Sequence, residues 1–149
     1  MIMKIAIVSG KDEGPTKLNA FDNALTAAGI GDVNLIKVSS MLAGNAEVLP
    51  LPKLKAGSMV NCVLSTITSS NKGDQITAVV AVAIGDELGC VVEKTGTNED
   101  SEKLKEEAVF MVRYMMEKRN VKINELVVED ATHIVEEIGS VVSSVVYLD

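Results

Sequence analysis

Runs of β-favouring residues follow one another with only short polar turns between them, and this succession constrains the fold more than any other feature. Residues 59–68 are rich in Val, Ile and Thr, and residues 75–84 and 89–93 are further apolar runs of strand length. Parallel strands need long crossover connections, usually helical, and the turns here are too short to hold them. A strictly parallel βαβ sheet is therefore not expected.

Two other segments have the spacing of amphipathic helices. Apolar residues recur at helical intervals between residues 18 and 28, and Gly29 is placed to end that helix. Residues 101–119 carry an apolar stripe opposite a charged face, with Asp100 or Ser101 as the cap. Two helices and many strands predict an α+β layered fold, and 149 residues suffice for one domain with a sizeable core. Further strands are expected at residues 4–9, 33–38, 125–128 and 140–148.

Polar segments, several of them containing Gly, separate these elements. Pro50-Leu51-Pro52 cannot continue a helix or a central strand, so it is expected to form a rigid connector. No repeat, low-complexity tract or linker indicates a second domain. Loops are expected at residues 10–17, 40–45, 69–74 and 96–100.

Composition excludes several classes of function. The net charge of -7, without any cluster of basic residues, argues against a nucleic-acid partner. No stretch is apolar enough to span a bilayer and no export signal precedes the first strand, so we expect no membrane partner and a cytoplasmic location. Cys62 and Cys90 lie in apolar runs without metal-ligand spacing, and the single His133 excludes a multi-histidine centre. No metal site is expected.

A pair of serines, Ser39 and Ser40, follows the strand predicted at residues 33–38. The hydroxyl of Ser40 can attack the carbonyl of Ser39 to give an ester, if the peptide is strained or well placed and donors stabilise the oxyanion. Elimination from that ester leaves dehydroalanine, which hydrolyses to a pyruvoyl group. Most serine pairs in turns only supply hydrogen bonds, so the pair alone does not establish this chemistry.

The segments around this pair, taken in order, resemble the pyruvoyl-dependent arginine decarboxylases. No short piece is decisive, but the ordered set covers nearly the whole chain and is quite specific. It comprises LNAFDNAL at 18–25, AGIG at 28–31, VNLIKVSS at 33–40, EVLPLPKL at 47–54, TAVVAVAI at 77–84, GCVVE at 89–93 and HIVEEIG at 133–139.

The resemblance implies a four-layer αββα sandwich with mainly antiparallel strands, in a single domain of residues 1–149. It implies that the chain cuts itself between Ser39 and Ser40, giving residues 1–39 (the β chain) and 40–149 (the α chain). The cleaved protomers would form a homotrimer with active sites between neighbours. The activity implied is that of a carboxy-lyase that converts L-arginine to agmatine and CO2 and feeds polyamine synthesis. Its cofactor would be the covalent pyruvoyl group formed from Ser40, with which the substrate amine forms a Schiff base.

Catalytic and self-processing residues follow from the same resemblance. Ser40 and Glu93 are the expected catalytic residues, with Glu93 as the general acid that protonates the carbon left by CO2. A carboxyl flanked by valines in a desolvated cleft would have a raised pKa, although a solvated glutamate at a strand end is the ordinary alternative. Ser39, Ser40 and Asn34 are expected to serve self-processing, the Asn34 amide donating to the oxyanion at Ser39.

Asp22, Gly31 and Val33 are the substrate-binding residues that the resemblance implies. The Asp22 carboxylate would accept paired hydrogen bonds from guanidinium, whereas Gly31 and Val33 would line the pocket through backbone groups. An aspartate on the polar face of an amphipathic helix is also ordinary, so the residue type alone does not favour this role.

Two alternatives to arginine decarboxylation remain open from the sequence. The same chemistry could act on another amino acid such as histidine, or the chain could be an uncleaved, inactive relative with a structural or regulatory role. The chain has Ala43-Gly44 where the family often has prolines, and Val63-Leu64-Ser65-Thr66 where it often has tyrosines. These departures can alter the shape of the pocket, so the resemblance implies the substrate less firmly than the reaction type.

Overall fold

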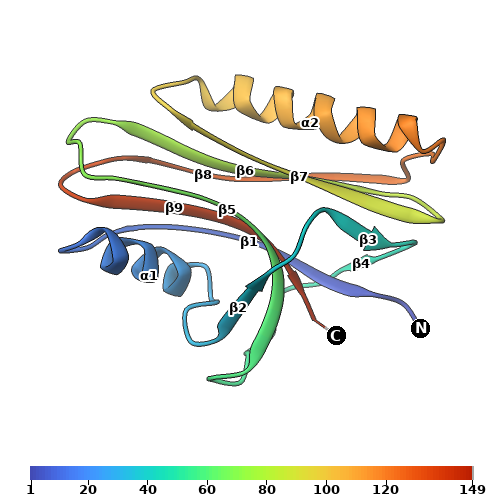
Figure 1. Ribbon diagram of the computed structural model, residues 1–149, viewed down its shortest axis with the longest axis horizontal. Coiled ribbons are helices and arrows are strands. Elements are labelled where there is room, and N and C mark those ends of the chain that lie inside the picture. The colour runs from blue at the N-terminus through green and yellow to red at the C-terminus, as the bar shows by residue number, and fades with distance from the viewer. Residues whose placement is uncertain (149) are drawn as a thin grey trace.

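The computed structural model describes residues 1–148, which form two sheets enclosed by two helices (Figure 1). The elements are β1 (Lys4–Glu13), α1 (Lys17–Ala27), β2 (Asn34–Lys37), β3 (Met41–Ala43), β4 (Glu47–Val48), β5 (Met59–Ser69), β6 (Gln75–Ile84), β7 (Leu88–Thr97), α2 (Ser101–Lys118), β8 (Glu125–Ile134) and β9 (Gly139–Tyr147).

The two sheets pack face to face. The first sheet has five strands in the order β2-β5-β9-β1-β4, and the second has four in the order β3-β7-β6-β8. Among the strands of residues 1–148, the β1–β4 and β2–β5 pairs are parallel and the other pairings are antiparallel. Figure 1 shows α1 on the outer face of the first sheet and α2 on the outer face of the second. The predicted α+β fold with mainly antiparallel strands is confirmed, and its layers run α, β, β, α.

Three apolar layers hold this sandwich together. One lies between α1 and the first sheet, a second between the sheets, and a third between the second sheet and α2. The middle layer is built from Val and Ile side chains such as Val63, Val80, Val91 and Val145, which are almost fully buried. Strands β6 and β9 are buried along nearly their whole length, which explains their continuous apolar or small-residue composition.

Both helices begin at side-chain caps, and for α2 the sequence predicted the cap at Asp100 or Ser101. The Thr16 hydroxyl accepts from the Asn19 backbone N–H, and the Asp100 carboxylate accepts from the Glu102 N–H. Helix α1 is followed by Gly29 at φ +86°, a left-handed conformation that glycine adopts without strain. Its buried face, with Ala20 and Ala24, then packs on the first sheet.

Several strands are longer than the sequence predicted. Strand β1 continues through Gly10 to Glu13, within a predicted loop, because each of these residues pairs with β9. Strand β7 runs past Glu93 to Thr97 in a hairpin with β6, so Glu93 lies within a strand and not at its end. The predicted loop at 40–45 contains the short strand β3, and β8 extends to Ile134. Strand β8 is a sheet edge, so its polar residues reach solvent and hide the strand pattern.

Within residues 1–148, no helix combines the length and the apolar character needed to cross a membrane.

Candidate functional site

The serine pair lies where the chain crosses from one sheet to the other. Before it, the Val38 N–H donates to the Cys62 carbonyl of β5 at 2.9 Å, which continues the β2–β5 pairing in the first sheet. After it, the Ser40 carbonyl accepts from the Val91 N–H at 2.8 Å, which begins the β3–β7 pairing in the second sheet. Ser39 is exposed between these two anchors and Ser40 is half-buried. The Ser39–Ser40 peptide is therefore held from both sides.

Glu93 lies on the strand that receives Ser40. It follows Val91 by two positions along β7, so both side chains are on the face toward the first sheet. Beside Glu93 is a cavity of about 250 Å³ that opens between the two sheets, lined by Lys37, Leu64, Ser65, Thr66, Glu93, Lys94 and Thr95. The structure thus places Ser39, Ser40 and Glu93 in one region.

The Glu93 carboxyl has an unusual electrostatic setting. The residue is exposed in a single chain, yet partial burial of its carboxyl beside the cavity raises its pKa above the ordinary value for glutamate, and the positive charge of Lys37 acts in the opposite direction. Within residues 1–148, no hydrogen bond or ion pair reaches this carboxyl. A raised pKa keeps a larger fraction of the side chain protonated near neutral pH, which is what a proton donor requires.

Cys62 belongs to the same neighbourhood. Burial raises the pKa of its thiol, while a hydrogen bond with Ser144 and the charge of Lys37 lower it, and the charge of Glu93 raises it. Burial also raises the pKa of Tyr147, whose hydroxyl donates to the Met41 carbonyl at 2.7 Å. The Tyr147 hydroxyl therefore anchors the strand that follows Ser40, and the Cys62 carbonyl anchors Val38 before the serine pair.

The remaining predicted residues form a second group, around the C-terminal end of α1. Asp22 is exposed and its carbonyl accepts from the Thr26 hydroxyl at 2.9 Å. Gly31 is pressed against the same threonine, because a Cβ at residue 31 would lie 2.3 Å from Thr26 Oγ1. Val33 is partly buried against the core under α1.

Asn34 also belongs to this second group. Its side-chain amide donates to the Gly57 carbonyl at 3.0 Å. Strand β2 continues in extended form from Asn34 to Val38, which places these two residues about 13 Å apart at roughly 3.3 Å per residue. Asn34 therefore lies at the end of this strand that is remote from the serine pair.

Comparisons with known proteins identify the family. The family model "Pyruvoyl-dependent arginine decarboxylase" matches residues 4–149. The chain belongs to the pyruvoyl-dependent arginine decarboxylases.

Relatives named pyruvoyl-dependent arginine decarboxylase are similar to this chain along most of their length. One from Methanothermobacter thermautotrophicus is 58% identical and covers 100% of this chain and 99% of its own. One from Methanocaldococcus jannaschii is 37% identical over 91% of this chain and 83% of its own. One from Pyrococcus horikoshii is 39% identical over 90% of this chain and 87% of its own.

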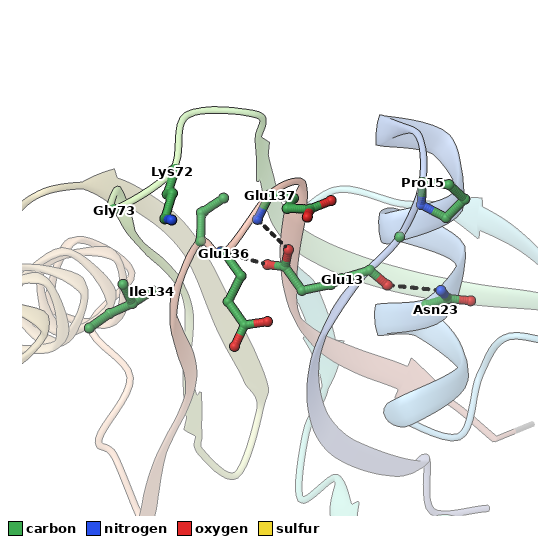
Figure 2. Close-up of a pocket in the computed structure, with 10 residues that line it drawn as sticks. Glu13, Pro15, Asn23, Lys72, Gly73, Ile134, Glu136 and Glu137 are labelled. Carbon is green, nitrogen blue, oxygen red and sulfur yellow. Dashed lines mark hydrogen bonds between the residues drawn. The ribbon is translucent and has the colours of Figure 1, made fainter.

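A cavity larger than the one beside Glu93 lies elsewhere in this decarboxylase-family chain, where β8 turns into β9. It measures about 1080 Å³ and is bordered by Glu13, Asn23, Lys72 and the turn at residues 134–137 (Figure 2). Figure 2 shows the Glu13 carboxylate directed at the backbone of that turn, where it accepts from the N–H groups of Glu136 and Glu137. The Glu13 carboxylate is thus engaged in holding the turn. The residues that line this cavity do not include Ser39, Ser40 or Glu93.

Sequence reasoning missed two features of the molecule. Lys37 borders the cavity of Glu93, but only the packing of two sheets brings their strands together. The Glu13–His133 contact, 2.5 Å between Oε2 and Nε2, joins residues 120 positions apart. Neither pair has a spacing that a sequence pattern could reveal.

Proposed function

We propose that this chain is a self-processing decarboxylase that converts L-arginine to agmatine and CO2 through a pyruvoyl group formed from Ser40. The observation that carries this proposal is the position of the serine pair, at the crossing between two sheets, with Glu93 on the adjoining strand. Membership of the family supports the reaction type and the substrate.

The backbone anchors suit a cut between Ser39 and Ser40. The Ser40 hydroxyl attacks the Ser39 carbonyl carbon, the Ser40 nitrogen leaves it, and an ester replaces the peptide bond. Elimination then breaks the ester, releases Ser39 as a carboxylate and leaves dehydroalanine at residue 40, which takes up water and loses ammonia. Val38 stays paired in the first sheet and Ser40 in the second, so both new ends keep their places.

The surroundings of Ser40 also suit the group it would become. When formed, the pyruvoyl group supplies a ketone that binds the substrate amine and takes up the electrons left by departing CO2. The Ser40 carbonyl, which would be the amide carbonyl next to that ketone, already accepts from the Val91 N–H. A donor at this oxygen stabilises negative charge that develops there.

Glu93 is the residue we assign to proton donation. It projects from β7 toward the first sheet, two residues beyond the strand position that binds Ser40. Burial raises its pKa, and no other group among residues 1–148 competes for its proton by a hydrogen bond. A protonated carboxyl in this place can return a proton to the carbon from which CO2 has left.

The substrate pocket requires more than one chain. Asp22, Gly31, Val33 and Asn34 are the residues we assign to guanidinium binding, pocket lining and processing, yet they gather around α1 and the start of β2, and about 13 Å of extended strand separates Asn34 from Val38. A homotrimer in which each pocket joins the second group of one copy to the serine crossing of its neighbour resolves this separation. The pocket would then be completed by assembly.

Intact mass under denaturing conditions tests the proposal. We expect two pieces, residues 1–39 and 40–149, the larger lighter by one ammonia than a piece with a free serine. Ser40→Ala should stay whole, whereas Ser39→Ala, which keeps the attacking hydroxyl, should still be cut. A wild-type chain that remains whole after prolonged incubation would reject the proposal and favour an inactive relative.

A panel of amino acids tests the substrate. CO2 release should be followed in parallel with arginine, lysine, ornithine and histidine, and agmatine should be identified in the arginine reaction. Faster turnover of histidine would keep the chemistry but replace the substrate.

A further inference from the structure

Lys37 is a charged residue that lies two positions before the serine pair. It is the last residue of β2 and pairs with Cys62, directly before the chain leaves the first sheet. Its side chain borders the same cavity of about 250 Å³ as Glu93, reached from the opposite sheet. The lysine and the glutamate therefore face one space from its two walls.

We propose that Lys37 sets the protonation of Glu93 during decarboxylation, acting as a positioning residue across the cavity between β2 and β7. This inference rests on the proposed function, because it assigns a purpose to Lys37 through the role of Glu93 as proton donor.

The other charged and titratable groups near Glu93 are either paired elsewhere or neutral, so they do not supply a positive charge to its carboxyl. Lys94, the next residue on β7, forms an ion pair with Glu107 of α2 at 3.2 Å. Cys62 of β5 and Tyr147 of β9 have pKa values raised by burial, so both are neutral at ordinary pH. Within residues 1–148, Lys37 is the cation whose field opposes the effect of burial on Glu93.

This balance matters because a proton donor must be protonated and must also release its proton. Burial alone favours the neutral acid and makes it a weaker donor, whereas a nearby positive charge favours the carboxylate. Proton transfer is most efficient when the pKa of the acid lies near the working pH. Lys37 would hold Glu93 between these limits.

The first test compares the pH dependence of kcat for arginine in three variants. Removing the charge in Lys37→Met should move the alkaline limb of kcat to higher pH and lower the plateau, because Glu93 becomes a weaker acid. Lys37→Arg keeps the charge and should keep the wild-type limb. Lys53→Met is the matched control, since Lys53 is exposed in the connector before β5 and its side chain forms no hydrogen bond or ion pair within residues 1–148. An unchanged limb in Lys37→Met would overturn the inference.

The second test does not depend on turnover or on cleavage. In uncut Ser40→Ala protein, the titration of Glu93 is followed by carboxyl carbon NMR, with Glu93→Gln to assign the resonance. Adding Lys37→Met should raise the midpoint of Glu93, and adding Lys53→Met should leave it in place. Equal midpoints with and without Lys37 would reject the inference even if the variant failed to cleave.

The two tests separate the inference from the function on which it rests. An inactive wild-type protein whose Glu93 midpoint still responds to Lys37 would contradict the proposed function and leave the electrostatic coupling established. An active enzyme whose Glu93 midpoint ignores Lys37 would contradict the inference alone.

Discussion

Two glutamates, Glu13 and Glu93, lie at different places along the sandwich, and their pKa values are shifted in opposite directions. Burial raises the pKa of Glu13, but hydrogen bonds from the Glu137 N–H, the His133 ring and the Glu136 N–H reverse this and lower it overall. Burial also raises the pKa of Glu93, and among residues 1–148 no hydrogen bond to its carboxyl counteracts this. The Glu13 side chain is only 24% exposed, whereas Glu93 is the more exposed of the two.

Exposure alone would predict the opposite order of pKa values, so hydrogen-bond donors decide it. The turn at residues 136–138 aims three backbone N–H groups at Glu13, which fixes it as a carboxylate with a structural task. Glu93, in the second sheet, borders a cavity, and no N–H group of residues 1–148 donates a hydrogen bond to its carboxyl. A carboxyl that can change its protonation is the one suited to chemistry.

The largest expected effect comes from removing the acid at the cavity. Glu93→Gln should still cut itself, because the attacking hydroxyl of Ser40 is intact, but kcat should fall by about 10²–10⁴-fold, the usual contribution of a general acid. CO2 release from arginine measures the rate, and intact mass confirms the cut.

Glu13→Gln is the matched control for that variant, because it makes the same chemical change at the other glutamate. It should cut itself and keep most of its turnover at a temperature where it is folded. A Glu93→Gln enzyme that works nearly as well as Glu13→Gln would show that another group supplies the proton.

A smaller effect is expected from replacing Asp22. The size of this effect on the KM for arginine shows whether a neighbouring copy of the chain covers the carboxylate. Asp22→Asn should raise the KM for arginine and leave the cut intact. An exposed ion pair contributes about 0–1 kcal/mol, and losing one partner of a buried pair costs about 3–5 kcal/mol. Asp22 is exposed in a single chain, so a large effect requires burial by assembly.

Substrate preference provides the control for Asp22. The wild-type enzyme should prefer arginine to lysine, because an ammonium cannot reproduce the planar fork of guanidinium. Equal turnover of the two amino acids, or an unchanged KM in Asp22→Asn, would exclude guanidinium binding by this carboxylate.

The sequence predicted the layers of the fold better than the limits of its strands. Strands such as β6 and β9 are evident from composition, because they are buried along nearly their whole length. The helices are evident from the spacing of their apolar residues. The end of β1 was predicted as a loop, because Lys11, Asp12 and Glu13 are polar and only pairing with β9 makes them a strand. Long-range pairing of this kind has no local pattern.

The residues of the candidate site were likewise only partly predictable from the sequence. Ser39, Ser40 and Glu93 were predicted through ordered motifs, and the structure brings them to one region through the β3–β7 pairing. The roles of Lys37 and Glu13 depend on side chains that meet from distant segments. Such contacts follow from how sheets pack, which the sequence alone does not specify.

A third effect concerns stability at Glu13. Replacing its carboxylate by an amide in Glu13→Gln weakens the bonds from the turn N–H groups and from His133, which should lower the free energy of unfolding by roughly 1–3 kcal/mol. Urea unfolding followed by circular dichroism, in uncut Ser40→Ala protein at one protein concentration, measures the change. Glu136→Gln is the control, because its side chain is exposed and only its backbone N–H binds Glu13. Similar losses in both variants would mean that charge in the turn, and not the Glu13 contacts, is responsible.

The smallest expected effect is the pH dependence of that same stability difference. The pKa of Glu13 is lower in the folded chain than its ordinary value, so its contribution is fully present above the unfolded value. The contribution is lost as the pH falls through the folded value, because protonation removes the charge that the N–H groups and His133 bind. The gap in unfolding free energy between the Ser40→Ala protein and its Glu13→Gln variant should therefore be constant near neutral pH and shrink in acid. Glu93 has a raised pKa, so its ionisation opposes folding, and the stability of the Ser40→Ala protein relative to its Glu93→Gln variant should rise, not fall, as the pH drops. A gap for Glu13→Gln that stays constant into acid would mean that the turn does not select the charged carboxylate, and the contrast between the two glutamates would fail.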